Sequence, residues 1–132
     1  MKFPFPFALL VLAGGCAAAG PYAQPYSIIE NDPVRSADPD VVPIVMNRVD
    51  DRTTLSPQRD VVAPGTHQVT IYVPPRKGFF NATQQTFELE TEPCTRYYLS
   101  AKLDNRVGQR WTPIVRSSER IGECEAKFAM NR

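Results

Sequence analysis

His67 is the only histidine in this chain of 132 residues and is therefore the first side chain to consider for catalysis. Together with a serine and either Asp60 or Glu88, it would supply the residue types of a hydrolytic triad. A lone histidine beside a turn is more often a hydrogen-bonded structural residue, and the chain has neither a Gly-x-Ser-x-Gly elbow nor a phosphate-binding glycine loop. We therefore expect that the protein is not an enzyme.

The sequence also gives no sign of a metal site or a cofactor. Cys94 and Cys124 have no further cluster of ligand residues nearby. The paired carboxylates Asp50 and Asp51 lie in a predicted turn, where such side chains bond to the local backbone. We expect neither a metal nor a cofactor.

The N-terminus has the form of an export signal. Lys2 is followed by the apolar run FPFPFALLVLA and then by small residues, and the run is too short to span a membrane. Residues 1–15 are therefore predicted to be a signal peptide. At the end of this segment, LAGGC at residues 12–16 resembles the bacterial lipobox. The resemblance implies that Cys16 is lipidated on its sulfur and becomes the new N-terminus.

Two processing routes remain open. Lipoboxes usually carry leucine three residues before the cysteine, where this chain has Ala13, and residues 17–19 would suit the ordinary signal peptidase, which would discard Cys16. The first route predicts attachment to a membrane by an N-terminal lipid, and Ala17 after the cysteine implies the outer membrane, facing the periplasm. The second predicts a soluble periplasmic or secreted protein.

Cys94 and Cys124 are predicted to form a disulfide. Lipidation of Cys16 leaves this even pair in an oxidising compartment. Closing a loop of about thirty residues would stabilise the fold by roughly 3–4 kcal/mol on the chain-entropy model. Two unpaired thiols are the alternative.

Composition divides the remaining chain into a tether and a folded part. Residues 16–40 are rich in proline, alanine, glycine, serine and aspartate, and Ile28 and Ile29 form their only aliphatic pair. Such a segment buries too little apolar surface to offset its ordering entropy, so we predict a flexible tether. Residues 41–124 are predicted to fold, and residues 125–132 to fray.

Alternation of apolar and polar residues predicts an all-β fold. Val69, Ile71 and Val73 point to one side of their segment, and similar runs lie at 84–90, 95–103 and 109–116. Thirteen prolines favour short strands joined by stiff loops. We predict a small antiparallel β-sandwich of about six to seven strands.

The same pattern predicts turns and a core. Pro64-Gly65 is expected to close one hairpin and residues 91–93 a second. Side chains on the apolar faces are expected to be buried, namely Val69, Ile71, Phe87, Leu89, Tyr97, Leu99 and Trp111. Neighbours such as Thr70 and Ser100 are expected to be exposed.

Three segments in order, APGTHQVTIYV, QTFELE and PCTRYYLSAK, resemble the small β-sandwich modules typified by the PEGA domain, over about residues 61–102. The chain is also similar to a group of uncharacterised proteobacterial envelope lipoproteins that share a W-x-P-x-V strand, here starting at Trp111, and a late cysteine, here Cys124. The resemblance implies a transthyretin-like or immunoglobulin-like sandwich without known catalysis.

Charge and surface aromatics narrow the functional classes. Without Lys2 the chain carries 14 basic and 14 acidic residues and no basic stripe, so a nucleic-acid partner is not expected. The leading hypothesis is a non-catalytic envelope protein that docks another envelope protein. The alternatives are an inhibitor of a lytic enzyme and a glycan or cell-wall binder, in which Tyr72, Phe80 and Tyr98 would stack on sugars. Two such rings on one face would favour the glycan, and an apolar loop tip or an unpaired strand edge would favour docking.

Overall fold

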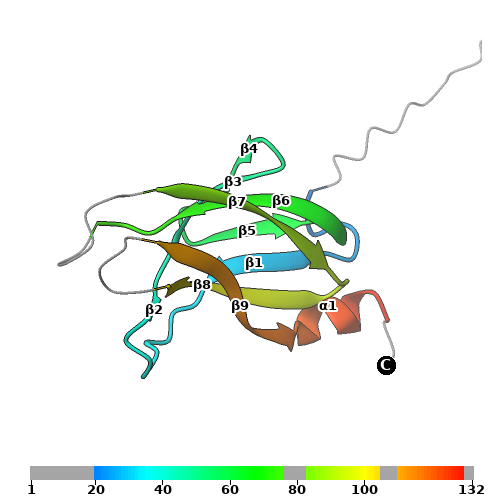
Figure 1. Ribbon diagram of the computed structural model, residues 1–132. Helices are drawn as coiled ribbons and strands as arrows, with labels where there is room; N and C mark the ends of the chain where they lie inside the picture. The colour runs from blue at the N-terminus through cyan, green and yellow to red at the C-terminus, as the bar shows by residue number, and fades with distance from the viewer. Residues whose placement is uncertain (1–19, 76–82, 105–109, 130–132) are drawn as a thin grey trace, which may run out of the picture.

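The computed structural model describes residues 20–75, 83–104 and 110–129, and it confirms an all-β fold (Figure 1). Two sheets lie face to face, which is compatible with the predicted β-sandwich. These ranges contain nine strands rather than six or seven, two of which are only two residues long, and one short helix, α1.

The larger sheet is built around β8, its longest inner strand. Its members are β1 (Ser27–Asn31), β2 (Val41–Val42), β5 (Arg59–Val62), β8 (Thr95–Leu103) and β9 (Trp111–Arg120). Strand β9 pairs with β8 along one edge, and β1 and β2 pair with it along the other. Strand β1 runs parallel to β8, and β5 follows it as an antiparallel outer strand.

The smaller sheet is antiparallel throughout. In spatial order its strands are β4 (Arg52–Thr53), β3 (Val45–Val49), β6 (Gly65–Tyr72) and β7 (Gln84–Thr91). The predicted turn at Asp50 and Asp51 is confirmed: it joins β3 to β4, and both residues have positive φ, 52° and 62°. Two central residues of this kind give the twist that suits a tight hairpin.

The two hairpins predicted at Pro64-Gly65 and at residues 91–93 are wrong. Strand β5 belongs to the larger sheet and β6 to the smaller one, so Pro64 and Gly65 carry the chain between sheets. Gly65 has φ 136°, a conformation that glycine tolerates. Strands β7 and β8 are likewise in different sheets. A turn signal marks where a strand ends, but not which sheet the chain enters next.

The prediction that residues 16–40 form a flexible tether is wrong for β1, and residues 16–19 lie outside the described residues. Strand β1 lies between β5 and β8, and both of its isoleucines are buried. Because successive strand residues point to opposite faces, Ile29 enters the main core and Ile28 enters a second core on the outer face of the sheet. The folded part therefore begins before residue 41.

The main core lies between the two sheets and contains most of the predicted core residues. The structure buries six of the predicted core residues, namely Val69, Ile71, Leu89, Tyr97, Leu99 and Trp111. Phe87 packs against them but is only partly buried. Thr70 is partly exposed, as expected for the outer face of β6, and its hydroxyl is hydrogen bonded to that of Thr86 at 2.7 Å.

The expectation that Ser100 is exposed is wrong, since only 3% of it is accessible. Its neighbours Leu99 and Ala101 face the main core, so Ser100 points to the outer face of the larger sheet. The connection between β1 and β2 covers this position, and Ser100 lines a groove together with Val34 and Pro39 of that connection.

The C-terminal end forms the helix α1 (Gly122–Lys127), where residues 125–132 were predicted to fray. Ile121 and Cys124 pack with Tyr26, Ile28 and other residues of the second core on the outer face of the larger sheet. Those contacts order the helix up to Lys127, and residues 130–132 lie outside the described residues.

Candidate functional site

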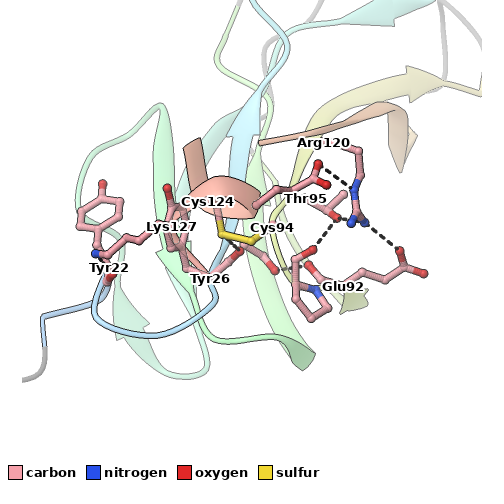
Figure 2. The surroundings of a disulfide bond; sticks show 11 residues. Tyr22, Tyr26, Glu92, Cys94, Thr95, Arg120, Cys124 and Lys127 are labelled. Carbon is pink, nitrogen blue, oxygen red and sulfur yellow. Dashed lines mark hydrogen bonds and ion pairs between the residues drawn. A yellow bond between two sulfur atoms is a disulfide. The ribbon is translucent and has the colours of Figure 1, made fainter. Parts of the chain in front are cut away.

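The predicted disulfide joins Cys94 to Cys124, beside Tyr26 and at α1 (Figure 2). The two Cα atoms are 5.3 Å apart and both residues are fully buried. The Cys94 N–H donates to the Tyr26 carbonyl at 2.7 Å, and the Ile121 N–H donates to the Cys94 carbonyl at 2.9 Å. The bridge therefore ties together the segment before β1, the start of β8 and α1.

Tyr22 connects this assembly to β5. Its ring stands edge-on to that of Tyr26, with centroids 4.9 Å apart, and 40% of Tyr22 is exposed. Lys127 Nζ, at the end of α1, donates to the Tyr22 carbonyl at 2.6 Å. Arg59 Nη2, from β5, donates to the Tyr22 hydroxyl at 3.2 Å. Two cations from distant parts of the chain thus meet at one tyrosine.

A hollow of about 450 Å³ opens beside Tyr22, and we call it the basic pocket. It is lined by Tyr22, Tyr26, Ile28, Arg59, Arg96, Ile121, Glu123 and Lys127. The apolar members Tyr26, Ile28 and Ile121 are buried and form its base. Cationic side chains surround that base, so the pocket combines apolar contact with positive charge.

A polar network continues from the pocket along the outer face of the same sheet. Arg96 Nε lies 3.6 Å from Glu30, and Arg96 Nη1 donates to Glu119 at 3.3 Å. The Tyr98 hydroxyl also donates to Glu119, at 2.6 Å, and this hydrogen bond to a carboxylate raises the pKa of Tyr98. Arg96 Nε is buried and has no hydrogen-bond acceptor among the described residues.

A second hollow, of about 610 Å³, lies further along the same face, where the β1–β2 connection crosses Ser100. We call it the proline groove, because its lining includes Pro33, Pro39, Pro43, Pro74 and Pro75. Arg116 also lines it and donates to the Asp32 carboxylate and the Val34 carbonyl, each at 2.9 Å.

A β-bulge directs Arg116 toward this groove. Val115 pairs with Leu99 and Ser117 pairs with Tyr98, which leaves Arg116 as the extra residue of β9. An extra residue of this kind bends a strand and changes the direction of its side chain.

The aromatic residues predicted to contact a ligand do not come together. Tyr72 alternates with the buried Ile71 and therefore faces outward from the smaller sheet, whereas Tyr98 faces outward from the larger one. Phe80 and the predicted lipidation residue Cys16 lie outside the described residues. Sequence reasoning missed the basic pocket, and its one local signal is the repeated Pro-Tyr pair at residues 21–22 and 25–26.

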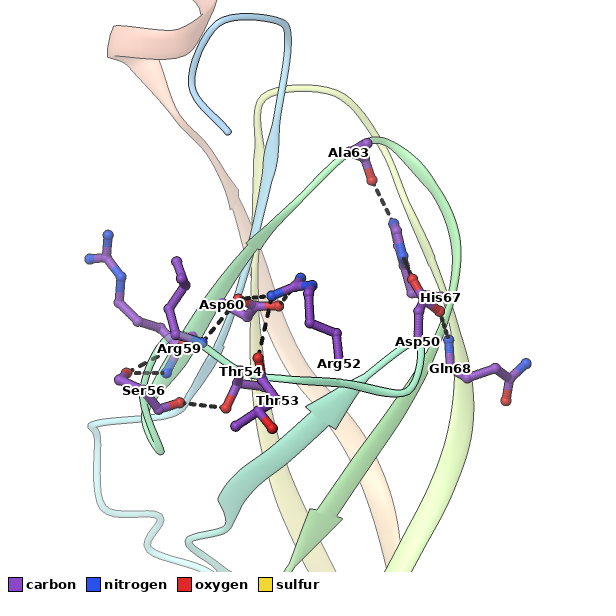
Figure 3. Close-up of polar contacts among 11 residues, drawn as sticks. Asp50, Arg52, Thr53, Thr54, Ser56, Arg59, Asp60, Ala63, His67 and Gln68 are labelled. Atoms are coloured by element: carbon purple, nitrogen blue, oxygen red, sulfur yellow. Dashed lines mark hydrogen bonds and ion pairs between the residues drawn. The ribbon is translucent and has the colours of Figure 1, made fainter. Parts of the chain in front are cut away.

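His67 contacts Asp50 rather than Asp60 or Glu88 (Figure 3). One ring nitrogen lies 2.5 Å from the Asp50 carboxylate and the other lies 2.5 Å from the Ala63 carbonyl. The Gln68 N–H also donates to Asp50, at 2.8 Å. The hydrogen bond with His67, followed by that with Gln68, lowers the pKa of Asp50. The histidine thus holds the β3–β4 turn against the crossing between the sheets.

Asp60 is itself buried and has a separate set of partners (Figure 3). Arg52 donates to both carboxylate oxygens, at 2.6 and 3.2 Å, and the Leu55 N–H donates at 3.2 Å. The hydrogen bond with Asp60 raises the pKa of Arg52. Since these donors all lie in the loop between β4 and β5 or beside it, Asp60 orders that loop.

Within residues 20–75, 83–104 and 110–129, no three histidine, cysteine or acidic residues are placed to hold a metal ion. None of the helices in these ranges has the length and apolar character needed to cross a bilayer. Comparison of the chain with protein-family models, curated proteins and solved structures gave no match.

Proposed function

We propose that the protein is a non-catalytic cell-envelope lipoprotein that docks an extended segment of another envelope protein along β9. One observation carries this proposal. Strand β9 is ten residues long, pairs with β8 on one side, and has no strand on its other side among the described residues. An unpaired edge offers a row of backbone donors and acceptors to a partner strand.

The second half of β9 is the best part of this edge. Gln85 of β7 already donates to the Trp111 carbonyl at 2.6 Å, and Pro113 has no N–H to offer. Beyond the bulge, Ser117 and Ser118 are exposed, small and uncharged. We therefore assign docking to residues 115–120.

An apolar contact accompanies this edge. Val115 pairs with Leu99, whose side chain enters the main core, so Val115 faces the same side of the sheet. It is nevertheless 43% exposed. A partner strand with an apolar residue opposite Val115 would cover it, so the preferred partner segment is extended and alternates apolar with polar residues.

The glycan alternative receives less support. Stacking on a sugar needs neighbouring rings, and Tyr72 and Tyr98 belong to opposite outer faces of the sandwich. No described feature favours an inhibitory loop.

Lipidation of Cys16 remains part of the proposal. Strand β1 begins at Ser27, so about ten residues would separate the lipid from the sandwich instead of the longer tether predicted from composition. A fully extended segment of that length spans about 35 Å at most. The docking edge would therefore work close to the membrane surface, on the periplasmic side of the outer membrane.

The test removes backbone donors from β9 one at a time. Successive N–H groups of a strand point to opposite edges, so Ser117→Pro and Ser118→Pro differ: one breaks pairing with β8 and the other removes a donor from the free edge. We expect the variant that keeps wild-type thermal stability to lose photo-cross-linked complexes formed in the envelope from a reactive residue at position 115. Ser117→Ala and Ser118→Ala are the controls and should retain them. A stable proline variant that forms the same complexes would refute docking at β9.

A further inference from the structure

Two cations of the basic pocket have no carboxylate partner. Arg59 and Lys127 both donate to Tyr22, through its hydroxyl and its carbonyl, and neither forms an ion pair with a carboxylate among the described residues. The one acidic residue of the lining is Glu123, which is exposed. Two positive charges therefore face the pocket with a single negative charge opposite them.

Arg96 is a third cation of the pocket lining. The charge of Arg96 is balanced by Glu30 and Glu119, yet its buried Nε–H has no hydrogen-bond acceptor among the described residues. Leaving a buried charged donor without an acceptor is costly, and such groups in native proteins usually meet water or a ligand. The Nε atom has almost no accessible surface, so Arg96 contributes its positive charge to the pocket lining rather than this donor.

The base of the pocket limits the size and character of the ligand. Tyr26, Ile28 and Ile121 give it an apolar surface, and about 450 Å³ is in the range of small-molecule sites. The ligand should therefore carry a compact anionic group next to a short apolar part.

We infer that the basic pocket binds a phosphate group. Its donors come from three elements, β5, β8 and α1, and so approach from different directions. A phosphate has oxygens pointing in several directions and can accept from all three, whereas a planar carboxylate matches a single guanidinium best. The phosphate could belong to a soluble ester or to a phospholipid headgroup.

The headgroup source depends on the proposed lipidation of Cys16, but the phosphate site itself does not. Between Cys16 and Tyr22 the chain spans about 20 Å at most. An acylated Cys16 would hold the pocket beside the lipid headgroups, where cationic side chains are attracted to anionic lipids.

The experiment titrates the oxidised full chain carrying Cys16→Ser with sn-glycerol 3-phosphate, and with glycerate as the carboxylate control. The signal is the NMR resonance of the Arg96 Nε–H, which should shift when an anion binds beside the guanidinium. We expect Arg59→Gln and Lys127→Gln each to weaken phosphate binding about tenfold. Glu123→Gln should strengthen it, and Arg48→Gln, on the smaller sheet, should leave it unchanged.

A second experiment distinguishes a phospholipid headgroup from a soluble phosphate ester. The same proteins are sedimented with phosphatidylglycerol vesicles and with phosphatidylcholine vesicles. If Lys127→Gln weakens binding to the anionic vesicles and Arg48→Gln does not, the ligand is a phospholipid headgroup. If the protein binds glycerol phosphate but the two variants sediment equally with the anionic vesicles, the ligand is a soluble ester.

No shift of the Arg96 resonance at millimolar glycerol phosphate, or equal weakening by Arg48→Gln, would overturn the phosphate site. Neither result bears on docking, because the titration involves neither the edge of β9 nor an acyl chain. Likewise, proline variants of β9 that lose their complexes should still bind glycerol phosphate as the wild type does.

Discussion

Single residues of this protein act mainly by closing contacts between different loops and strands. His67 joins the β3–β4 turn to the crossing at Ala63, Arg52 satisfies the buried carboxylate of Asp60, and Tyr22 joins β5 to α1. Each of these polar side chains has its partners in another loop or strand. Their removal should therefore loosen the connection between elements more than the elements themselves.

The contact between Asp50 and His67 predicts a loss of stability in acid. The folded-state pKa of Asp50 is lowered by His67 and Gln68, so ionised Asp50 stabilises the fold above its unfolded-state pKa. That contribution disappears as the pH falls through the folded-state pKa. Thermal unfolding of Asp50→Asn should therefore depend less on pH below about pH 5 than that of the wild type.

The control for this prediction is Asp51→Asn, because asparagine tolerates the positive φ of both turn positions and Asp51 contacts neither His67 nor Gln68. It should keep the wild-type dependence on pH. If both variants lost the dependence equally, the contact with His67 would not be its source.

The phase of β6 is tested by two neighbouring residues. Ile71 is fully buried between the sheets, so Ile71→Ala should lower the free energy of unfolding by about 2–5 kcal/mol. Thr70 faces outward and loses only its hydrogen bond to Thr86, so Thr70→Ala should cost less than about 1 kcal/mol. Denaturant titration measures both. Equal costs would mean that Ile71 and Thr70 do not lie on a buried and an outward face of one strand.

At the scale of elements, the disulfide and the second core add a layer to the sandwich. Strand β1 and α1 meet on the outer face of the larger sheet, and the Cys94–Cys124 bond holds the helix where Ile121 can pack. Arg120 supports the same junction by donating to Glu125 of α1 at 3.2 Å and to Thr95 of β8 at 3.4 Å. The basic pocket exists only because this layer is in place.

Removal of the disulfide should therefore affect stability and the pocket together. Thiol titration of the denatured, unreduced protein should find neither Cys94 nor Cys124 free. The double variant Cys94→Ala, Cys124→Ala should lower the free energy of unfolding by about 2–5 kcal/mol, the usual cost for a small exported protein. Two reactive thiols in the unreduced protein would contradict the bond.

At the scale of the whole molecule, the proposed lipid would lie at the same end of the sandwich as the basic pocket. The segment before β1 leads from Cys16 to the basic pocket, so a lipid there would turn this end of the larger sheet toward the membrane. The proposed docking edge, β9, belongs to the same sheet. A partner would then be held beside the bilayer.

Lipidation predicts a specific processing defect. Cys16→Ser removes the sulfur that receives the lipid, so the variant should accumulate as precursor and incorporate no labelled fatty acid. Ala18→Ser, two residues away, should mature normally, and fractionation should place it in the outer membrane. Normal maturation of Cys16→Ser would exclude the lipid and favour the soluble alternative.

Patterns within one strand or one turn could be read from the sequence. The alternation at Val69 and Ile71 identified the buried face of β6, and the paired aspartates at 50 and 51 identified a turn, because both signals depend on residues that are adjacent in the chain. The pairing of Cys94 with Cys124 followed from their number and the expected compartment.

Only the tertiary structure decided which strands are neighbours. Strand β1 is ordered by its parallel partner, in which Ile29 lies opposite Tyr97. The Pro64-Gly65 pair fits a hairpin as well as a crossing between sheets, and burial of both β5 and β6 selects the crossing. Ser100 is covered by a connection, and the basic pocket gathers residues 22, 59, 96 and 127. These features depend on which surfaces bury each other, and residue periodicity carries no information about partners distant in the chain.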